Sequence, residues 1–395
     1  MDLPDLRIAL FSGNYNYTRD GANQALNRLV GSLLANGAAV RVYSPKVEKP
    51  AFAPTGDLVG TPSMGMPFGR GEYRIPTGLG RRVRRDLETF RPNIVHLSAP
   101  DPSGHAALRW AQDRDIPVLA SVHTRFETYP RYYNMAFLEP LIIGLLRRFY
   151  NRCDALVAPS QSMIDELLAQ GMHDDIGLWS RGVERSVFAS KNRDMTWRRS
   201  LGLADDDVAI VFLGRLVMEK GLDVFAETIV QMRKRQVPHR VLVIGDGPAR
   251  CWFEEALPGG IFVGFKTGEE LGAALASGDI FFNPSITETF GNVTLEAMAS
   301  GLPVVAAGAT GAASLVVDGE TGALVPPGKT QEQTATRFAE AIAPYCTNAD
   351  LRARHGAAGE ARSCEYSWDA INQVVAKMYS RLIMERRALQ EAEAA

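Results

Sequence analysis

Short apolar segments alternate along the chain with longer stretches in which apolar residues recur every three or four positions. The short segments have the length and β-branched character of buried strands, and the longer stretches have the period of amphipathic helices. Regular alternation of the two favours parallel sheets with connecting helices. The strands expected in a first series are Arg7–Phe11, Ala39–Tyr43, Ile94–Leu97, Val118–Val122 and Ala155–Ala158. Those of a second series are Ala209–Leu213, Val241–Ile244, Ile261–Val263, Ile280–Asn283, Val304–Ala306 and Ala323–Val325.

Two such series predict two doubly wound domains, because a chain of 395 residues is longer than one hydrophobic core usually supports. We expect a first domain over residues 1–185, a polar linker over 186–197 and a second domain over 198–369. Residues 370–395 have a helical pattern. The segment Ala51–Pro76 is rich in glycine and proline without periodicity, which predicts a long loop.

Composition and charge exclude several classes of protein. The chain is 46% hydrophobic and 22% charged with a net charge of −2, so it lacks the basic surplus of a nucleic-acid-binding protein. Its four cysteines are not at metal-ligand or redox spacing, which favours a reducing compartment. We expect no secretory signal and no membrane-spanning segment, because the start MDLPDLRIALFSG has no basic leader and no run of about 20 apolar residues occurs.

Ligands of open parallel sheets bind beyond the carboxyl ends of the strands, so we searched those ends for polar residues. Gly21 follows the first strand and stands at the start of a helix, where backbone can approach a phosphate or sugar. His123 lies at the end of the fourth strand, where it could hydrogen-bond a ligand hydroxyl. A flexible turn and a structural histidine are the simpler alternatives for these two residues.

Two segments of the second domain carry stronger signals. In GRLVMEKG, Arg215 and Lys220 lie in a glycine-bounded loop before a helix, and fixed positive charge there suits a departing diphosphate. In NPSITETFGNVTLEAM, Glu288 precedes a helix that opens near Phe290, Gly291 and Asn292, and Glu296 lies further along it. Carboxylates can hold sugar or ribose hydroxyls while the helix start faces a diphosphate. Solvated loop residues and an ordinary surface helix are the alternatives.

Three other motifs are weaker. Gly245 and Gly247 follow a strand, but Arg250 stands where a dinucleotide fingerprint has its third glycine. Asp113–Asp115 and Asp205–Asp207 have the carboxylate spacing of some metal-dependent transferases, but they precede strands. We therefore predict that both acidic runs are solvated turns.

Taken together, GRLVMEKG, the seven-residue gap between Glu288 and Glu296, and ASGLPVVA resemble the retaining nucleotide-sugar transferases of glycosyltransferase family 4 over nearly the whole chain. SVHTRFETY and WSRGVERSVF resemble the branch with bacterial α-mannosyltransferases and sulfoquinovosyl diacylglycerol synthases, whose acceptors are commonly lipids. The resemblance implies the GT-B fold: α/β, with two Rossmann-like domains facing across a cleft and the C-terminal helix crossing back to the first domain.

The resemblance also implies a role for each candidate residue. Arg215 and Lys220 would bind the diphosphate. Glu288, with the backbone near Phe290, Gly291 and Asn292, would hold donor-sugar hydroxyls, and Glu296 would bind the ribose. His123 would contact the transferred sugar near its 6-position, and Gly21 would face the donor phosphate or acceptor. Asp20 and Arg125 depart from the family pattern, which leaves the acceptor details open.

The expected function is retaining transfer of a mannosyl- or glucosyl-type hexose from a GDP- or UDP-sugar, without cofactor or catalytic metal. The expected acceptor is a membrane glycerolipid or lipid-linked glycan. Arg81, Arg82, Arg84 and Arg85, together with the apolar stretch 132–152, suggest docking of a cytoplasmic protein on the anionic inner face of the membrane. A nicotinamide-dependent oxidoreductase and an inactive transferase-like binding protein remain alternatives.

Overall fold

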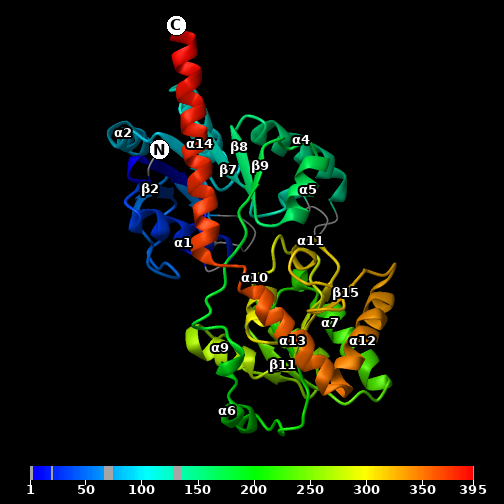
Figure 1. The fold of residues 1–395 in the computed structure, drawn as a ribbon. Helices are drawn as coiled ribbons and strands as arrows, with labels where there is room; N and C mark the ends of the chain where they lie inside the picture. Colours follow the sequence, from blue (N-terminus) through cyan, green and yellow to red (C-terminus); the bar gives the residue numbers. More distant parts are fainter. Residues whose placement is uncertain (1–2, 19–20, 66–73, 128–134, 395) are drawn as a thin grey trace. The chain divides into compact units, whose positions relative to one another are not determined.

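The computed structural model describes residues 3–18, 21–65, 74–127 and 135–394 (Figure 1). The chain divides into two compact units, of which unit 1 comprises Met1–Arg181 with Trp368–Ala395 and unit 2 comprises Gly182–Ser367. Each unit is built on a parallel sheet with helical connections. The α/β architecture predicted from the alternating pattern is therefore confirmed.

Unit 1 contains a seven-stranded sheet in the order β3-β2-β1-β6-β7-β8-β9, and every neighbouring pair is parallel. A separate antiparallel pair, β4 and β5, lies outside it. The elements are η1 (Leu3–Asp5), β1 (Arg7–Phe11), α1 (Gly21–Ala35), β2 (Ala39–Ser44), β3 (Asp57–Gly60), β4 (Ser63–Gly65), β5 (Arg74–Pro76), α2 (Arg81–Phe90), β6 (Ile94–Leu97), α3 (Pro102–Gln112), β7 (Val118–Ser121), η3 (Ala136–Leu138), α4 (Glu139–Tyr150), β8 (Ala155–Ala158), α5 (Gln161–Ala169), β9 (Ile176–Leu178) and α14 (Trp368–Ala394).

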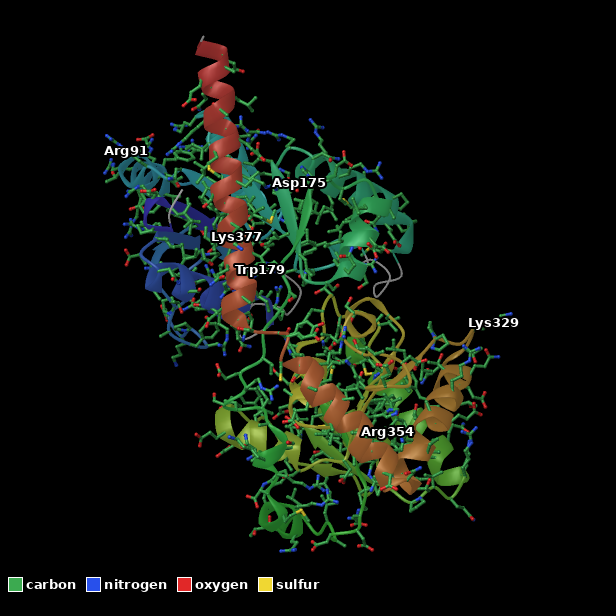
Figure 2. All side chains as sticks on the ribbon, viewed as in Figure 1. Arg91, Asp175, Trp179, Lys329, Arg354 and Lys377 are labelled. Carbon is green, nitrogen blue, oxygen red and sulfur yellow. The ribbon has the colours of Figure 1, made fainter. Side chains whose placement is uncertain are left out.

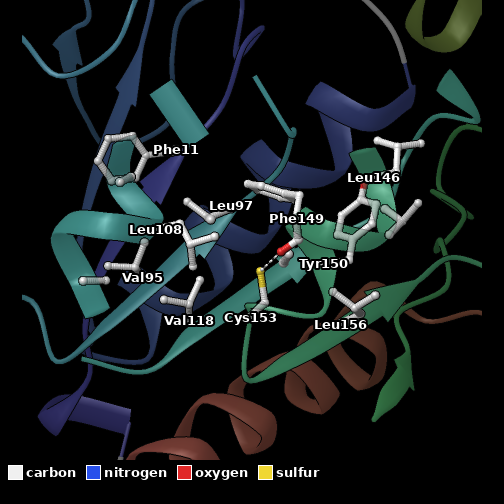
Figure 3. Packing of buried hydrophobic residues seen from close by; sticks show 14 of the residues in the cluster. Phe11, Val95, Leu97, Leu108, Val118, Leu146, Phe149, Tyr150, Cys153 and Leu156 are labelled. Carbon is white, nitrogen blue, oxygen red and sulfur yellow. Dashed lines mark hydrogen bonds between the residues drawn. The ribbon is translucent and has the colours of Figure 1, made fainter. Parts of the chain in front are cut away.

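Both faces of this sheet are covered. Helices α2, α3, α4 and α5 contribute buried side chains to one hydrophobic cluster with β6, β7 and β8, part of which is drawn in Figure 3. The C-terminal helix α14 contacts α1, and it approaches β9 so closely that a Cβ on Gly177 would lie 2.5 Å from the sulfur of Met378. The side chain of Tyr379 on α14 also reaches His96 of β6. Helix α14 is therefore an integral part of unit 1.

Unit 2 contains a six-stranded parallel sheet in the order β12-β11-β10-β13-β14-β15. Two buried clusters form its core, one with α7, α8 and α12 and the other with α9 and α10. The elements are η4 (Ser190–Asn192), α6 (Met195–Ser200), β10 (Ala209–Leu213), η5 (Met218–Lys220), α7 (Leu222–Lys234), β11 (Arg240–Ile244), α8 (Arg250–Ala256), β12 (Ile261–Phe262), α9 (Gly268–Ala276), β13 (Ile280–Asn283), α10 (Asn292–Ala299), β14 (Val304–Ala307), α11 (Thr310–Ala313), β15 (Gly322–Val325), α12 (Gln331–Thr347) and α13 (Ala349–Ser363).

The expected strands all occur, with ends that differ by at most one residue. The prediction of a long loop over Ala51–Pro76 is wrong, because this segment supplies β3 at the sheet edge and the β4–β5 pair. Residues 66–73 of that segment lie outside the described residues. The short strand β9 was also missed. These strands have three or four residues each, too few for a periodic pattern to emerge.

The segment expected to be a linker, residues 186–197, carries η4 and the start of α6. It is fastened within unit 2: Arg193 pairs with Asp279 at 2.8 Å, and the backbone N–H of Asp194 donates to Ser277 Oγ at 2.9 Å. The domain boundaries read from the sequence stay a prediction.

Candidate functional site

The candidate site in unit 2 lies at the carboxyl ends of β10 and β13, which are neighbours in the sheet. The chain leaves β10 through Gly214 and Arg215 and makes the short turn η5 before α7. It leaves β13 at Asn283 and passes through a loop before α10. Because parallel neighbours end at the same edge, the two loops meet there.

The meeting point is an ion pair between Lys220 and Glu288. The Lys220 Nζ lies 2.9 Å from Glu288 Oε1, and the other carboxylate oxygen accepts a hydrogen bond from Asn283 Nδ2 at 3.1 Å. The Glu288 side chain is 9% exposed and that of Lys220 is 33% exposed. Both carboxylate oxygens are thus held by donors, which fixes the orientation of the group.

Glycines permit this local geometry. Gly221 and Gly291 have φ of +74° and +95°, a region that side chains with a Cβ enter only at a cost. Each immediately precedes a helix, α7 and α10 respectively. A Cβ on Gly291 would stand 3.1 Å from Glu288 Oε2, and one on Gly311 would stand 2.7 Å from the Glu288 carbonyl oxygen. Glycine therefore lets three chain segments close around Glu288.

The remaining candidates of unit 2 lie nearby along the chain. Phe290 is buried, Asn292 is the first residue of α10, and Glu296 lies just over one turn along that helix, half-buried. Arg215 is exposed in the loop after β10. The structure thus brings Lys220 and Glu288 into direct contact and places Arg215, Phe290, Gly291, Asn292 and Glu296 on the two loops and the helix that flank this pair.

The glycines of the weak dinucleotide motif have a packing role. A Cβ on Gly245 would lie 1.9 Å from the carbonyl oxygen of Gly214, and one on Gly247 would lie 2.5 Å from that of Leu216. These glycines let the turn after β11 lie against the turn after β10. The acidic residues Asp113, Asp115, Asp205 and Asp206 are exposed, whereas Asp207 is partly buried: Asp115 accepts hydrogen bonds from Arg386 and Gln390, and Asp205 pairs with Arg199.

The two candidates of unit 1 also lie beyond strand ends. Gly21 is the first residue of α1, and Asp20 before it lies outside the described residues. His123 follows β7 and is partly exposed. Its Nδ1 lies 2.8 Å from Nη2 of the buried Arg181, and its Nε2 lies 2.8 Å from Ser121 Oγ. Desolvation, the Arg181 charge and His96 hold the pKa of His123 well below 6.5, so the ring is neutral near pH 7.

Sequence reasoning missed the partners of these residues. Asn283 carries a weak signal, because it is a polar residue that ends an apolar strand. Arg181 belongs to WSRGVERSVF, a segment whose only signal in the sequence is its resemblance to the family. Ser121, His96 and Tyr379, which extend the contacts of His123, carry no signal of their own.

The described residues contain neither a candidate metal centre nor a helix that could span a membrane. No group of three or more His, Cys, Asp or Glu side chains there is arranged to hold a metal ion. None of the helices in the described ranges combines the length and apolar character needed to cross a bilayer.

In comparison with known proteins, each of two parts of the chain matches a glycosyltransferase family model. Residues 19–187 match the model described as Glycosyltransferase Family 4, and residues 207–347 match Glycosyl transferases group 1. The fold resembles that of sucrose-phosphate synthase from Thermosynechococcus elongatus, with a TM-score of 0.77, 21% identity, and coverage of 96% of this chain and 100% of that one. This likeness supports the GT-B fold.

Three relatives illustrate the sequence similarity. A GDP-mannose-dependent alpha-mannosyltransferase of Mycolicibacterium smegmatis is 30% identical over 81% of this chain and 84% of its own length. A sulfoquinovosyl transferase of Arabidopsis thaliana is 31% identical over 70% of this chain, which spans only 54% of that protein. An alpha-monoglucosyldiacylglycerol synthase of Acholeplasma laidlawii is 22% identical over 76% of this chain and 80% of its length. The chain belongs to glycosyltransferase family 4, and it is a hexosyltransferase of the GT-B fold.

Proposed function

We propose that the chain transfers a mannosyl- or glucosyl-type hexose with retention of configuration, from a GDP- or UDP-sugar held at the Lys220–Glu288 pair. The observation that carries this proposal is the pair itself, a fixed cation and anion at the carboxyl edge of the unit 2 sheet. Lys220 and Arg215 bind the diphosphate, and Glu288 accepts hydrogen bonds from sugar hydroxyls. A carboxylate offers about four acceptor positions, so its two existing bonds leave room for a hydroxyl.

Catalysis in this proposal rests on stabilising the leaving group. The acceptor oxygen forms a bond to the anomeric carbon as the bond from that carbon to the phosphate oxygen breaks. The acceptor proton passes to the departing phosphate, which leaves with its electron pair. Arg215, Lys220 and the N–H groups at the start of α10 stabilise the resulting negative charge. Glu296 binds the donor ribose, Phe290, Gly291 and Asn292 line the site, and His123 and Gly21 serve the sugar and the acceptor side.

A nucleotide-release assay with a panel of GDP- and UDP-hexoses tests the reaction class. We expect release of one nucleoside diphosphate, undiminished by EDTA, because protein cations supply the positive charge. Activity that chelation abolishes and Mg²⁺ or Mn²⁺ restores would contradict this mechanism. Release of neither nucleotide from any hexose donor in the presence of lipid acceptors would contradict the proposed donor class.

The proposed acceptor is a membrane lipid, reached through the α4 side of unit 1. Phe137, Leu141 and Leu145 recur at every fourth position and are 77%, 61% and 59% exposed, whereas Leu146 and Phe149 are buried in the core. The helix therefore buries one side and presents an apolar stripe on the other. The part of the predicted apolar stretch at 132–134 lies outside the described residues.

A groove of about 560 Å³ runs beside this stripe. Its apolar lining includes Phe126, Ile142 and Leu145, and Arg148 and Arg152 also line it. Ala99, Pro100 and Asp101, which follow β6, line it as well, so the groove includes the carboxyl edge of the sheet. An apolar trough bordered by arginines suits the acyl chains and anionic head groups of a bilayer surface.

Helix α2 adds positive charge to the same face of the sheet. Its buried residues Val83 and Leu87 belong to the core cluster that also contains Leu146 and Phe149 of α4. Arg81, Arg82, Arg84 and Arg85 are all exposed on its outer side. Each basic residue near an anionic surface contributes roughly 1 kcal/mol. We propose that α2 and α4 together dock on the anionic inner face of the cytoplasmic membrane.

Co-sedimentation with vesicles tests the docking surface. We expect wild-type protein to bind vesicles with 30% anionic lipid (roughly a physiological surface potential) better than neutral vesicles, and to lose binding in high salt. Reversal of the four α2 arginines to glutamate removes the preference for anionic lipid, and Leu141→Gln/Leu145→Gln lowers binding to both. Reversal of the exposed Arg233 and Lys234 in unit 2 is the control and leaves binding unchanged. Equal binding of wild type to both vesicles would contradict the proposal.

A further inference from the structure

A chain of buried and partly buried hydrogen bonds connects the C-terminal helix of unit 1 to His123. Tyr379 of α14 places its hydroxyl 2.5 Å from His96 Nδ1, and His96 Nε2 lies 2.8 Å from Ser121 Oγ. Ser121 Oγ also lies 2.8 Å from His123 Nε2, and His123 Nδ1 lies 2.8 Å from Arg181 Nη2. These five residues come from four separate segments, so the chain exists only in the folded unit.

The arginine fixes the direction of every bond in this chain. A guanidinium carries only donors, so Nδ1 of His123 must be an acceptor. A neutral His123 then carries its proton on Nε2 and donates to Ser121 Oγ. Ser121 in turn donates to His96 Nε2, and His96 donates from Nδ1 to the Tyr379 hydroxyl. One tautomer of each histidine satisfies all the contacts.

Arg181 is itself held in one geometry. Its side chain is buried, and Nη1 donates to the carbonyl oxygens of Trp179 and Ser180 at 2.9 and 3.1 Å. The guanidinium lies 4.9 Å from the centre of the Trp179 ring, within cation–π range. Trp179 is labelled in Figure 2, and its ring also makes an edge contact with His123 at 5.4 Å. The donor to His123 is therefore preorganised.

The histidines stay neutral over the working pH range. Burial lowers the pKa of His96 to about 3. Burial, Arg181 and His96 lower that of His123, while burial raises the pKa of Tyr379 above its usual value. The ionisable groups in this hydrogen-bonded chain are His123, Arg181, His96 and Tyr379. Each keeps the protonation state on which the bond directions depend.

We propose that Arg181 is a positioning residue for hexosyl transfer, which locks His123 as the neutral tautomer with its proton on Nε2. Both ring nitrogens are then engaged inside unit 1, so His123 neither gives nor takes a proton during transfer. Its contribution is to hold the end of β7, and with it the sugar and acceptor side of the site, in place. This inference rests on the proposed function for its kinetic consequence, whereas the tautomer can be measured without any substrate.

Three variants separate positioning from charge and from fold stability. Arg181→Gln keeps an N–H donor for His123 Nδ1, whereas Arg181→Met removes both donor and charge. Arg181→Met also removes a donor from the carbonyl oxygens of Trp179 and Ser180, which costs stability, so the melting temperature of each variant is measured as well. Arg41→Met is the matched control, because Arg41 pairs with Asp86 in the same unit and takes no part in the chain.

The experiment combines ¹⁵N NMR of histidine-labelled protein with steady-state kinetics. We expect the His123 signals of wild type and Arg41→Met to report a proton on Nε2 between pH 5.5 and 8. In Arg181→Met we expect mixed tautomers and a His123 pKa that rises, because a repelling charge is lost. The kcat of this variant should fall about 10²-fold, with a small change in donor KM. It should fall further below pH 6.5, where the freed ring takes up a proton. Arg181→Gln should restore most of the His123 tautomer with its proton on Nε2 and most of the wild-type kcat.

Two results would overturn the inference. One is a His123 that keeps the Nε2 proton and normal kcat in Arg181→Met with only the melting temperature reduced. The other is an Arg181→Gln variant as impaired as Arg181→Met, because charge rather than donation would then be required. If wild-type protein transfers no hexose, the proposed function fails, and the tautomer measurement still decides whether Arg181 orients His123.

Discussion

Lys220 and Glu288 in unit 2 meet as an ion pair, whereas the polar groups behind His123 in unit 1 form a chain in which only the terminal arginine is charged. Both arrangements lie at the carboxyl ends of parallel strands. Unit 2 presents charge on loops shaped by glycines, which suits the binding of a charged donor. In unit 1, the buried side chains of Arg181 and Ser121 hold a neutral histidine by its two ring nitrogens. The same sheet type thus supports two different tasks, one electrostatic and one positional.

Removing either member of the ion pair should have the largest effect. We expect Lys220→Ala and Glu288→Gln each to lower kcat roughly 10²–10³-fold, because each removes one preorganised contact from the transition state. Initial rates of nucleotide release and the far-ultraviolet circular dichroism of each purified variant provide the measurement. Lys329→Ala is the control, since Lys329 is exposed in the same unit. A near-normal rate in either site variant would remove this pair from the mechanism.

The glycine that shapes the loop should matter next. Alanine at Gly291 would have φ of +95° and a Cβ 3.1 Å from the Glu288 carboxylate. The backbone strain should destabilise unit 2 by about 1–2 kcal/mol, and displacement of Glu288 should lower activity more than that loss of stability explains. Urea unfolding and nucleotide release on one preparation separate the two effects. Gly259→Ala is a matched control, because Gly259 also has positive φ but no atom within 4 Å of an added Cβ. Equal activity of the two variants would show that loop shape is unimportant.

The neutral histidines of unit 1 should make it sensitive to acid. His96 has a folded pKa of about 3 and an ordinary unfolded value near 6.5, so the unfolded chain binds more protons between these values. Stability is therefore complete above about pH 6.5 and falls as pH drops, by up to about 1.4 kcal/mol per pH unit for this residue. We expect the difference in free energy of unfolding between pH 7 and pH 5 to shrink in His96→Gln. An unchanged difference would mean that His96 is not the titrating group.

The contrast between the units also explains what the sequence could predict. Strands such as Ile280–Asn283 are fully buried, so each appears in the sequence as a clear apolar run. In GRLVMEKG, the charged residues lie within a few positions of one another, so the motif can be recognised from the sequence alone. Lys220 and Glu288 were both identified because each follows a recognisable strand. Their direct contact required the order of β10 and β13 in the sheet, which periodicity does not encode.

The contacts of His123 were beyond sequence reasoning. Arg181 lies 58 positions from His123, and Tyr379 lies 283 positions from His96, so only the folded unit brings them together. In a segment as polar as that around Arg181, the sequence alone predicts that an arginine is exposed to solvent, whereas Arg181 is buried. Short edge strands such as β9 and β3 were missed for a related reason, because sheet pairing rather than local propensity determines them.

The most direct test of the account is calorimetric titration of the protein with GDP and UDP, for wild type, Lys220→Ala and His123→Ala. The account predicts that one nucleotide binds wild type, that Lys220→Ala weakens its binding at least tenfold, about 1.4 kcal/mol, and that His123→Ala binds it with nearly unchanged affinity. A Lys220→Ala variant that binds the nucleotide as tightly as wild type would contradict the assignment of the donor diphosphate to unit 2.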